Sequence, residues 1–149
     1  MRILRQFEEF LEDGTVRKRS PNIPRARSLM EESMKRREFL GQMMDKIGIS
    51  DANANYFIEN SYDVLIELIR AGMLLEGFDS SGRGAHEAEV AYLRRMGFSE
   101  NKVRFMNSLR YFRNGIKYYG KAFDSEYGKR VLDFMNEICP RLKSNVNGK

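Results

Sequence analysis

Three cations recur at helical spacing within residues 108–121, SLRYFRNGIKYYGK. On an α-helix, Arg110, Arg113 and Lys117 are three and four residues apart, so their side chains form one stripe on the helix surface. Like charges at this spacing repel one another unless an anion or acidic side chains neutralise them. The stripe therefore favours a negatively charged ligand such as a phosphate group.

An amide and two adjacent tyrosines accompany this cationic stripe. Asn114, Tyr118 and Tyr119 provide hydrogen-bonding groups for phosphate and aromatic rings that stack on a base. Arg113 and Tyr118 are about 140° apart around an ideal helix, so they converge only if the helix bends or ends, or if a second chain completes the site. Because Asn114 and Gly115 are poor helix formers, we expect a kink there that gathers the guanidinium, amide and phenol groups into one pocket.

His86 is the only histidine of the chain. It precedes Val90 by one helical turn and so borders the apolar face of its predicted helix, where a packed or surface histidine is the default interpretation. Asp63 stands in the apolar stretch NSYDVLIELI, where it either faces solvent or pairs with a buried cation. The candidate nucleotide- or RNA-binding residues are Arg110, Arg113, Lys117, Tyr119, Lys121 and His86.

Metal and cofactor sites are not indicated by the sequence. One cysteine and one histidine do not supply the ligands of a zinc site. No Walker-type phosphate loop is present, and the glycines of GRGAHEAE do not follow a predicted strand, as a dinucleotide site requires. We therefore predict neither a metal nor a cofactor.

The composition is that of a basic globular chain. The net charge is +5, and residues 94–121 hold eight basic residues and one acid. This concentration of positive charge favours a polyanionic partner. A single cysteine, Cys139, cannot form an internal disulfide, the N-terminus does not read as a signal peptide, and no apolar run is long enough for a membrane helix. We expect a cytoplasmic protein that does not associate with membranes.

Apolar periodicity of the helical type runs through most of the chain, and no alternating strand pattern competes with it. The expected fold is all-α, an antiparallel up-and-down bundle of four to five main helices with a short N-terminal helix. Residues 1–24 are expected to form that short helix and a basic linker, residues 25–143 the bundle, and residues 144–149 a disordered tail after Pro140. The expected helices lie at about 2–12, 25–47, 51–76, 85–96, 99–120 and 122–142.

The chain resembles the HEPN domain family over roughly residues 53–142. The resemblance is carried by the YD pair at Tyr62 and Asp63, by the helix start AHEA, and by RYFRNGIKYYG at residues 110–120. It implies a small helical bundle that is often dimeric and is frequently encoded beside a minimal nucleotidyltransferase. The branch with Tyr-Tyr-Gly at this site, which is archaeal in character, is the most similar.

The ribonuclease motif of that family is an arginine followed, after four to six residues, by a histidine. Arg113 matches the arginine and Asn114 the polar residue that usually follows it, whereas Tyr118 or Tyr119 stands where the histidine belongs. The resemblance thus implies Arg113, Asn114 and Tyr118 as the candidate catalytic residues. A tyrosine with an ordinary pKa near 10 is protonated at neutral pH and transfers protons poorly there. It still hydrogen-bonds phosphate and stacks on bases.

Three interpretations remain open at this point. The first is a HEPN-type module that binds nucleotide or RNA at a basic dimer cleft, in a toxin–antitoxin or nucleotidyltransferase-associated system. The second is a ribonuclease toxin that uses Arg113 with Tyr118 or His86 and is silenced by a nucleotidyltransferase antitoxin. The third is a non-catalytic structural bundle in which Arg113 pairs with Asp63 or with helix carbonyls.

Overall fold

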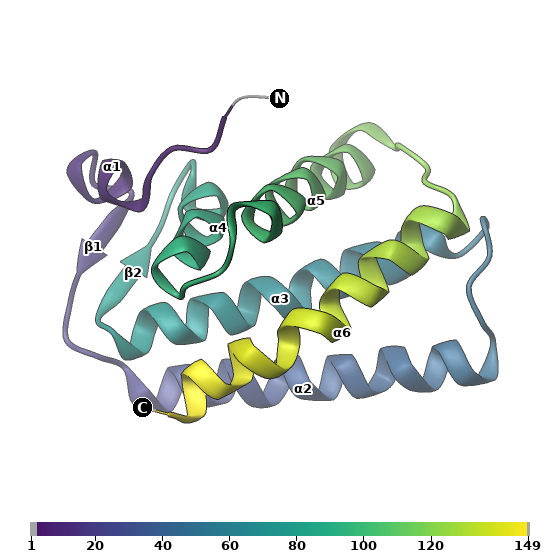
Figure 1. Ribbon diagram of the computed structural model, residues 1–149, viewed down its shortest axis with the longest axis horizontal. Helices are drawn as coiled ribbons and strands as arrows, with labels where there is room; N and C mark the ends of the chain where they lie inside the picture. The colour runs from purple at the N-terminus through teal and green to yellow at the C-terminus, as the bar shows by residue number, and fades with distance from the viewer. Residues whose placement is uncertain (1–2, 149) are drawn as a thin grey trace.

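The computed structural model describes residues 3–148 and has the predicted all-α architecture (Figure 1). Four long helices and the shorter α4 form an antiparallel bundle, and the small α1 lies beside it. The helices are α1 (Phe7–Glu12), α2 (Ile23–Lys46), α3 (Ala54–Leu75), α4 (Ala85–Arg95), α5 (Glu100–Tyr119) and α6 (Ser125–Asn147).

Helix α3 is the centre of the bundle. Its buried residues lie around most of its circumference, from Ala54 to Leu74, so the helix needs neighbours on several sides. Helices α2 and α6 pack along it on one side, and α4 and α5 pack on another (Figure 1). The central helix thereby sets the positions of all the side chains that carry candidate chemistry.

Two short strands were not expected from the sequence. β1 (Val16–Lys18) pairs antiparallel with β2 (Phe78–Ser80), with Val16 opposite Ser80. Strands of three residues are too short to give a periodic signal, so the expectation of a linker without strands was wrong. The pairing also draws the N-terminal segment onto the bundle, because Phe7, Phe10 and Val16 belong to the same apolar core as α3.

Several helix ends differ from the predicted ones. Helix α1 begins at Phe7, because Gln6 caps it and donates its N–H to the Glu9 carboxylate at 2.8 Å; Arg2, the predicted start, lies outside the described residues. Helix α3 begins after Asn53, whose side chain accepts the Ser50 N–H.

The last helix does not end at Pro140. Helix α6 continues through this proline to Asn147, which corrects the expectation of a disordered tail from residue 144; Lys149 lies outside the described residues. Leu142 and Val146 are both buried one turn apart on the same face. Their burial offsets the backbone hydrogen bond that the proline cannot donate.

Candidate functional site

Helix α5 carries most of the predicted site residues. The Ser99 side chain caps its start, and Gly120, with φ at +65°, ends it in the left-handed conformation that glycine adopts without strain. The helix is continuous through Asn114 and Gly115, so it does not end between Arg113 and Tyr118. The two side chains therefore leave the helix in different directions.

A cavity of about 720 Å³ lies at the C-terminal end of α5. The structure brings four of the predicted residues, Asn114, Tyr118, Tyr119 and Lys121, together at this cavity. Tyr118 and Tyr119 are 64% and 79% exposed, so their rings are available to a ligand. We call this site the tyrosine cavity; its lining residues are Tyr111, Phe112, Asn114, Gly115, Tyr118, Tyr119, Lys121 and Phe123.

The loop that closes the tyrosine cavity is fixed to α3 by one side chain. Asn55 donates its amide hydrogen to the Lys121 carbonyl at 2.8 Å and accepts the Phe123 N–H at 3.0 Å. The Phe123 ring lies 5.2 Å, centroid to centroid, from that of Phe112 on α5. The loop residues that line the cavity are thus held by both hydrogen-bonded and apolar contacts.

Of the two other cations of the predicted stripe, Lys117 lies close to this end of α5 and Arg110 lies further back along the helix. The Lys117 ammonium is 5.4 Å from the centroid of the Tyr118 ring, which places a positive charge beside an exposed aromatic face. The Arg110 Nε donates to the Asn107 side chain at 3.0 Å. Lys117 is exposed, whereas Arg110 is half-buried.

Arg113 does not line the tyrosine cavity but points toward α3. Its Nη2 is 3.6 Å from the Asp63 carboxylate, and its guanidinium carbon is 5.3 Å from the centroid of the Tyr62 ring. The side chain is only 15% exposed, and within residues 3–148 it makes no hydrogen bond; its Nε is buried without a partner. The Arg113 guanidinium therefore does not share the cavity with Tyr118 and Tyr119. It contacts Asp63, as expected if the chain is a non-catalytic structural bundle.

His86 and Arg113, which are far apart in the sequence, contact the same side chain. The His86 ring is 6.1 Å, centroid to centroid, from that of Tyr62, the same ring that Arg113 contacts. Its Nδ1 is 3.1 Å from a carboxylate oxygen of Glu89, and its side chain is half exposed. His86 and Arg113 thus border one tyrosine that is itself buried.

The Glu89 carboxylate is fully buried and is contacted by three side chains, those of His86, Arg70 and Ser80. The Arg70 guanidinium donates to Glu89 through Nε at 2.6 Å and through Nη2 at 3.1 Å, and the Ser80 hydroxyl donates to it at 3.0 Å. Burial raises the pKa of Glu89, but hydrogen bonds from His86 and Arg70 outweigh burial and leave its pKa below the ordinary value. The group is therefore an ionised carboxylate at neutral pH.

The sequence interpretation missed Glu89, Arg70 and Ser80 as parts of a site. The available signal was the spacing of His86 and Glu89, three residues apart on one helix, with a charged residue inside the apolar run AEVAYL. Burial, followed by the field of Glu89, raises the pKa of Tyr62 well above its ordinary value. Tyr62 is therefore a neutral phenol that contacts both the histidine and the arginine.

Comparisons with known proteins give no family for this chain. No protein-family model matches it, and no curated protein or solved structure does so. Among residues 3–148, no three histidine, cysteine or acidic side chains gather where they would hold a metal ion. None of the described helices combines the length and apolar character that crossing a bilayer requires.

Proposed function

We propose that the chain is a HEPN-type module that binds single-stranded RNA or its nucleotides at the tyrosine cavity. The observation that carries the proposal is the open cavity lined by two exposed tyrosines, the Asn114 amide and Lys121. Tyrosine rings stack on nucleotide bases, the Asn114 amide hydrogen-bonds the polar edge of a base, and the Lys121 ammonium pairs with a phosphate. A nucleotide carries the groups that make all three kinds of contact.

The charge distribution supports the same ligand. The segment 94–121, with eight basic residues and one acid, includes the whole of α5. Such a concentration of cations attracts a polyanion and makes its binding sensitive to salt. Base stacking on exposed aromatic side chains contributes about 1–3 kcal/mol per base, so two tyrosines suffice for measurable affinity.

The proposal is tested by fluorescence anisotropy with a labelled single-stranded RNA. We expect the Tyr118→Ala/Tyr119→Ala variant to lose at least about tenfold in affinity, which corresponds to 1.4 kcal/mol. The matched control is Tyr56→Ala on α3, since Tyr56 is 69% exposed and does not line the tyrosine cavity. Equal RNA affinities for the wild type and the double variant would show that the tyrosine cavity is not the binding site.

A ribonuclease is the second candidate, and one specific arrangement favours it. His86 and Arg113 border the same Tyr62 ring, and the Nδ1 of His86 faces the ionised Glu89. A histidine oriented in this way presents its Nε2 for proton transfer, as in catalytic histidine–carboxylate pairs. In this candidate, Nε2 takes the proton of an RNA 2′-hydroxyl and Arg113 neutralises the phosphodiester.

Cleavage assays distinguish the two candidates. Cleavage of single-stranded RNA that is lost in both His86→Ala and Arg113→Ala would establish the ribonuclease. Binding without cleavage supports the module alone. A basic dimer cleft and a nucleotidyltransferase antitoxin, both implied by the resemblance, stay predictions, and co-purification with the product of the adjacent gene tests the latter.

A further inference from the structure

A second cavity, of about 480 Å³, adjoins the tyrosine cavity and is lined by α5, by the start of α6 and by the loop between them. The two cavities share Phe112 on α5 and Phe123 in that loop (Figure 1). A chain molecule bound in one cavity therefore reaches the other by passing this aromatic pair. We call the second site the α5–α6 cavity; it is also lined by Phe105, Asp124, Tyr127 and Arg130.

Aromatic side chains form much of the wall of the α5–α6 cavity. Helices α5 and α6 both pack on α3, and they meet each other at this end through their rings. The Tyr127 ring on α6 lies 5.4 Å, centroid to centroid, from that of Phe112 and 5.3 Å from that of Phe123. These three rings and that of Phe105 are only partly buried, so the cavity offers aromatic surface on which a nucleotide base can stack.

Arg130 brings an unpaired cation to this aromatic cavity. Its guanidinium carbon is 5.8 Å from the centroid of the Phe105 ring and 5.8 Å from that of the Tyr127 ring, so cation–π attraction holds it beside both rings. The side chain is exposed, and no acidic side chain within residues 3–148 forms an ion pair with it. A phosphate group of a ligand therefore finds a guanidinium whose charge is not neutralised by the chain itself.

Asp124 adds a carboxylate to the same cavity without pairing with Arg130. Its side chain accepts the Tyr127 N–H at 2.9 Å and so caps α6, and it is exposed. A carboxylate has several lone pairs, so it can accept further hydrogen bonds from a ligand. A nucleotide satisfies both charges, because its phosphate pairs with Arg130 while its base donates to Asp124. Guanine presents an amino group beside a ring N–H, whereas uracil has no amino group.

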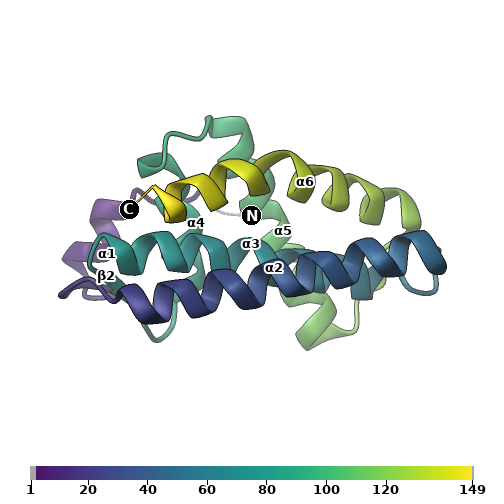
Figure 2. The ribbon, with the colours of Figure 1, turned by 90° about the horizontal axis from the view of Figure 1, so that it is seen from below.

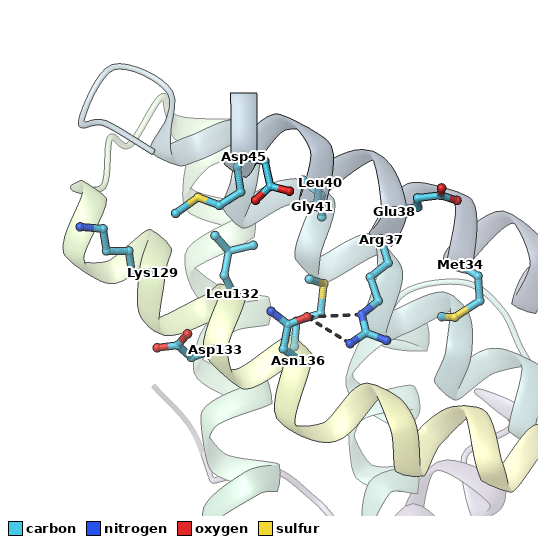
Figure 3. Close-up of a pocket in the computed structure, with 12 residues that line it drawn as sticks. Met34, Arg37, Glu38, Leu40, Gly41, Asp45, Lys129, Leu132, Asp133 and Asn136 are labelled. Carbon is cyan, nitrogen blue, oxygen red and sulfur yellow. Dashed lines mark hydrogen bonds between the residues drawn. The ribbon is translucent and has the colours of Figure 1, made fainter. Parts of the chain in front are cut away.

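The residue before Arg130 on α6, Lys129, lines a different cavity. Helices α2 and α6 lie side by side over much of their length (Figure 2). Lys129 lines the hollow of about 550 Å³ between them, together with Glu38, Asp45 and Asp133 (Figure 3). Acids outnumber bases among the lining residues of that hollow, so a phosphate backbone is disfavoured there. Lys129 and Arg130 are thus adjacent exposed cations that differ in the cavity they line.

We propose that single-stranded RNA bound at the tyrosine cavity continues past Phe112 and Phe123 into the α5–α6 cavity, which takes an adjacent nucleotide and prefers guanine. The phosphate of this nucleotide pairs with Arg130, and its base stacks on the aromatic wall with its donor edge at Asp124. This second site rests on the RNA binding proposed for the tyrosine cavity. It adds a sequence preference that the exposed tyrosines do not supply, because stacking tolerates every base.

Fluorescence anisotropy of the full chain with labelled single-stranded RNA tests the contact at Arg130. We expect Arg130→Gln to bind at least about fivefold more weakly than the wild type and to lower the slope of log affinity against log salt by about 0.7, because one phosphate contact is lost. The matched control is Lys129→Gln, which removes the same charge from the other cavity and should leave both values near those of the wild type. Equal affinities and slopes for Arg130→Gln and Lys129→Gln overturn the second site.

Two RNAs of equal length, one containing guanosine and one made only of uridine, test the base preference. The wild type should bind the guanosine-containing RNA at least about fivefold more tightly. Asp124→Asn should lose most of this preference while α6 stays capped, because asparagine caps a helix as well as aspartate does. A wild type that binds both RNAs equally overturns the assignment of guanine, and so does a preference that Asp124→Asn leaves unchanged.

The tyrosine double variant separates a failure of the second site from a failure of RNA binding at the tyrosine cavity. If Tyr118→Ala/Tyr119→Ala weakens binding and Arg130→Gln does not, the tyrosine cavity stands and the second site is overturned. If the wild type binds no RNA, or the double variant binds as tightly as the wild type, both are overturned. Melting temperatures of the variants establish that a loss of affinity is not a loss of fold.

Discussion

His86 on α4 and Arg113 on α5 border the ring of one buried residue, Tyr62 on α3. Each of the two also has an acidic partner: Glu89 for the histidine, and Asp63 for the arginine. The two acids differ in surroundings, because the Glu89 side chain is 1% exposed and that of Asp63 is 34% exposed. Substitutions of these acids therefore have different expected effects.

Replacing Asp63 by Asn tests whether Arg113 is available to an anion. The change removes a negative charge 3.6 Å from the guanidinium, so we expect RNA affinity to rise about two- to fivefold. Because Asp63 is partly exposed, the free energy of unfolding should fall by no more than about 1 kcal/mol. Anisotropy and urea denaturation measure the two effects; unchanged affinity with a clear loss of stability indicates a purely structural Arg113.

The salt dependence of RNA binding tests the contribution of Arg113 directly. If its guanidinium meets a phosphate, Arg113→Ala should lower the slope of log affinity against log salt by about 0.7. Arg113→Lys keeps the charge and should restore most of the slope, although it loses the planar donor geometry. A slope that is identical in the wild type and Arg113→Ala contradicts a phosphate contact at this residue.

The pH dependence of stability should depend on Glu89. Its pKa in the folded chain lies below the ordinary value of 4.5, because hydrogen bonds from His86 and Arg70 outweigh the opposing effect of burial. The stabilisation is therefore present above that ordinary pKa and is lost as the pH falls through the folded pKa. Urea denaturation across acidic pH should show this loss.

The Glu89→Gln variant tests whether the Glu89 carboxylate causes this pH dependence of stability. It leaves Arg70 without its buried charge partner, so we expect a loss of about 3–5 kcal/mol at neutral pH and a flatter acid profile. Glu32→Gln is the control, because Glu32 lies on the surface of α2 with its side chain 66% exposed. A Glu89→Gln variant as stable as the wild type would show that the cluster contributes nothing to folding.

Two glycine-to-alanine substitutions should have opposite effects on stability. At Gly77, φ is +83° and an added Cβ would lie 2.4 Å from the Arg19 carbonyl oxygen, so we expect a loss of about 2–3 kcal/mol. At Gly41, space is open and the backbone is helical, so Gly41→Ala should raise the melting temperature by about 2–4 °C. Thermal unfolding followed by circular dichroism measures both; a destabilised Gly41→Ala would mean that the surroundings of Gly41 are not open.

The amino-acid sequence determined the features that depend on neighbours along the chain. Apolar residues recurring every three or four positions predicted the six helices and the all-α bundle, because that spacing reports contacts within one turn of a helix. The same local reasoning placed Ser99 at the start of α5 and Gly120 at its end. The predicted surface stripe of three cations was wrong for Arg113, whose side chain is 15% exposed and packs against α3.

Only the tertiary structure decided which partner each of these side chains meets. Arg113 turns to Tyr62 and Asp63 while Tyr118 lines a cavity, and His86 meets the Tyr62 ring and Glu89. Apolar periodicity also did not predict the pairing of β1 with β2 or the continuation of α6 through Pro140. These contacts join helices that are distant in the sequence, and they follow from how many apolar side chains pack together around α3, which local spacing does not encode.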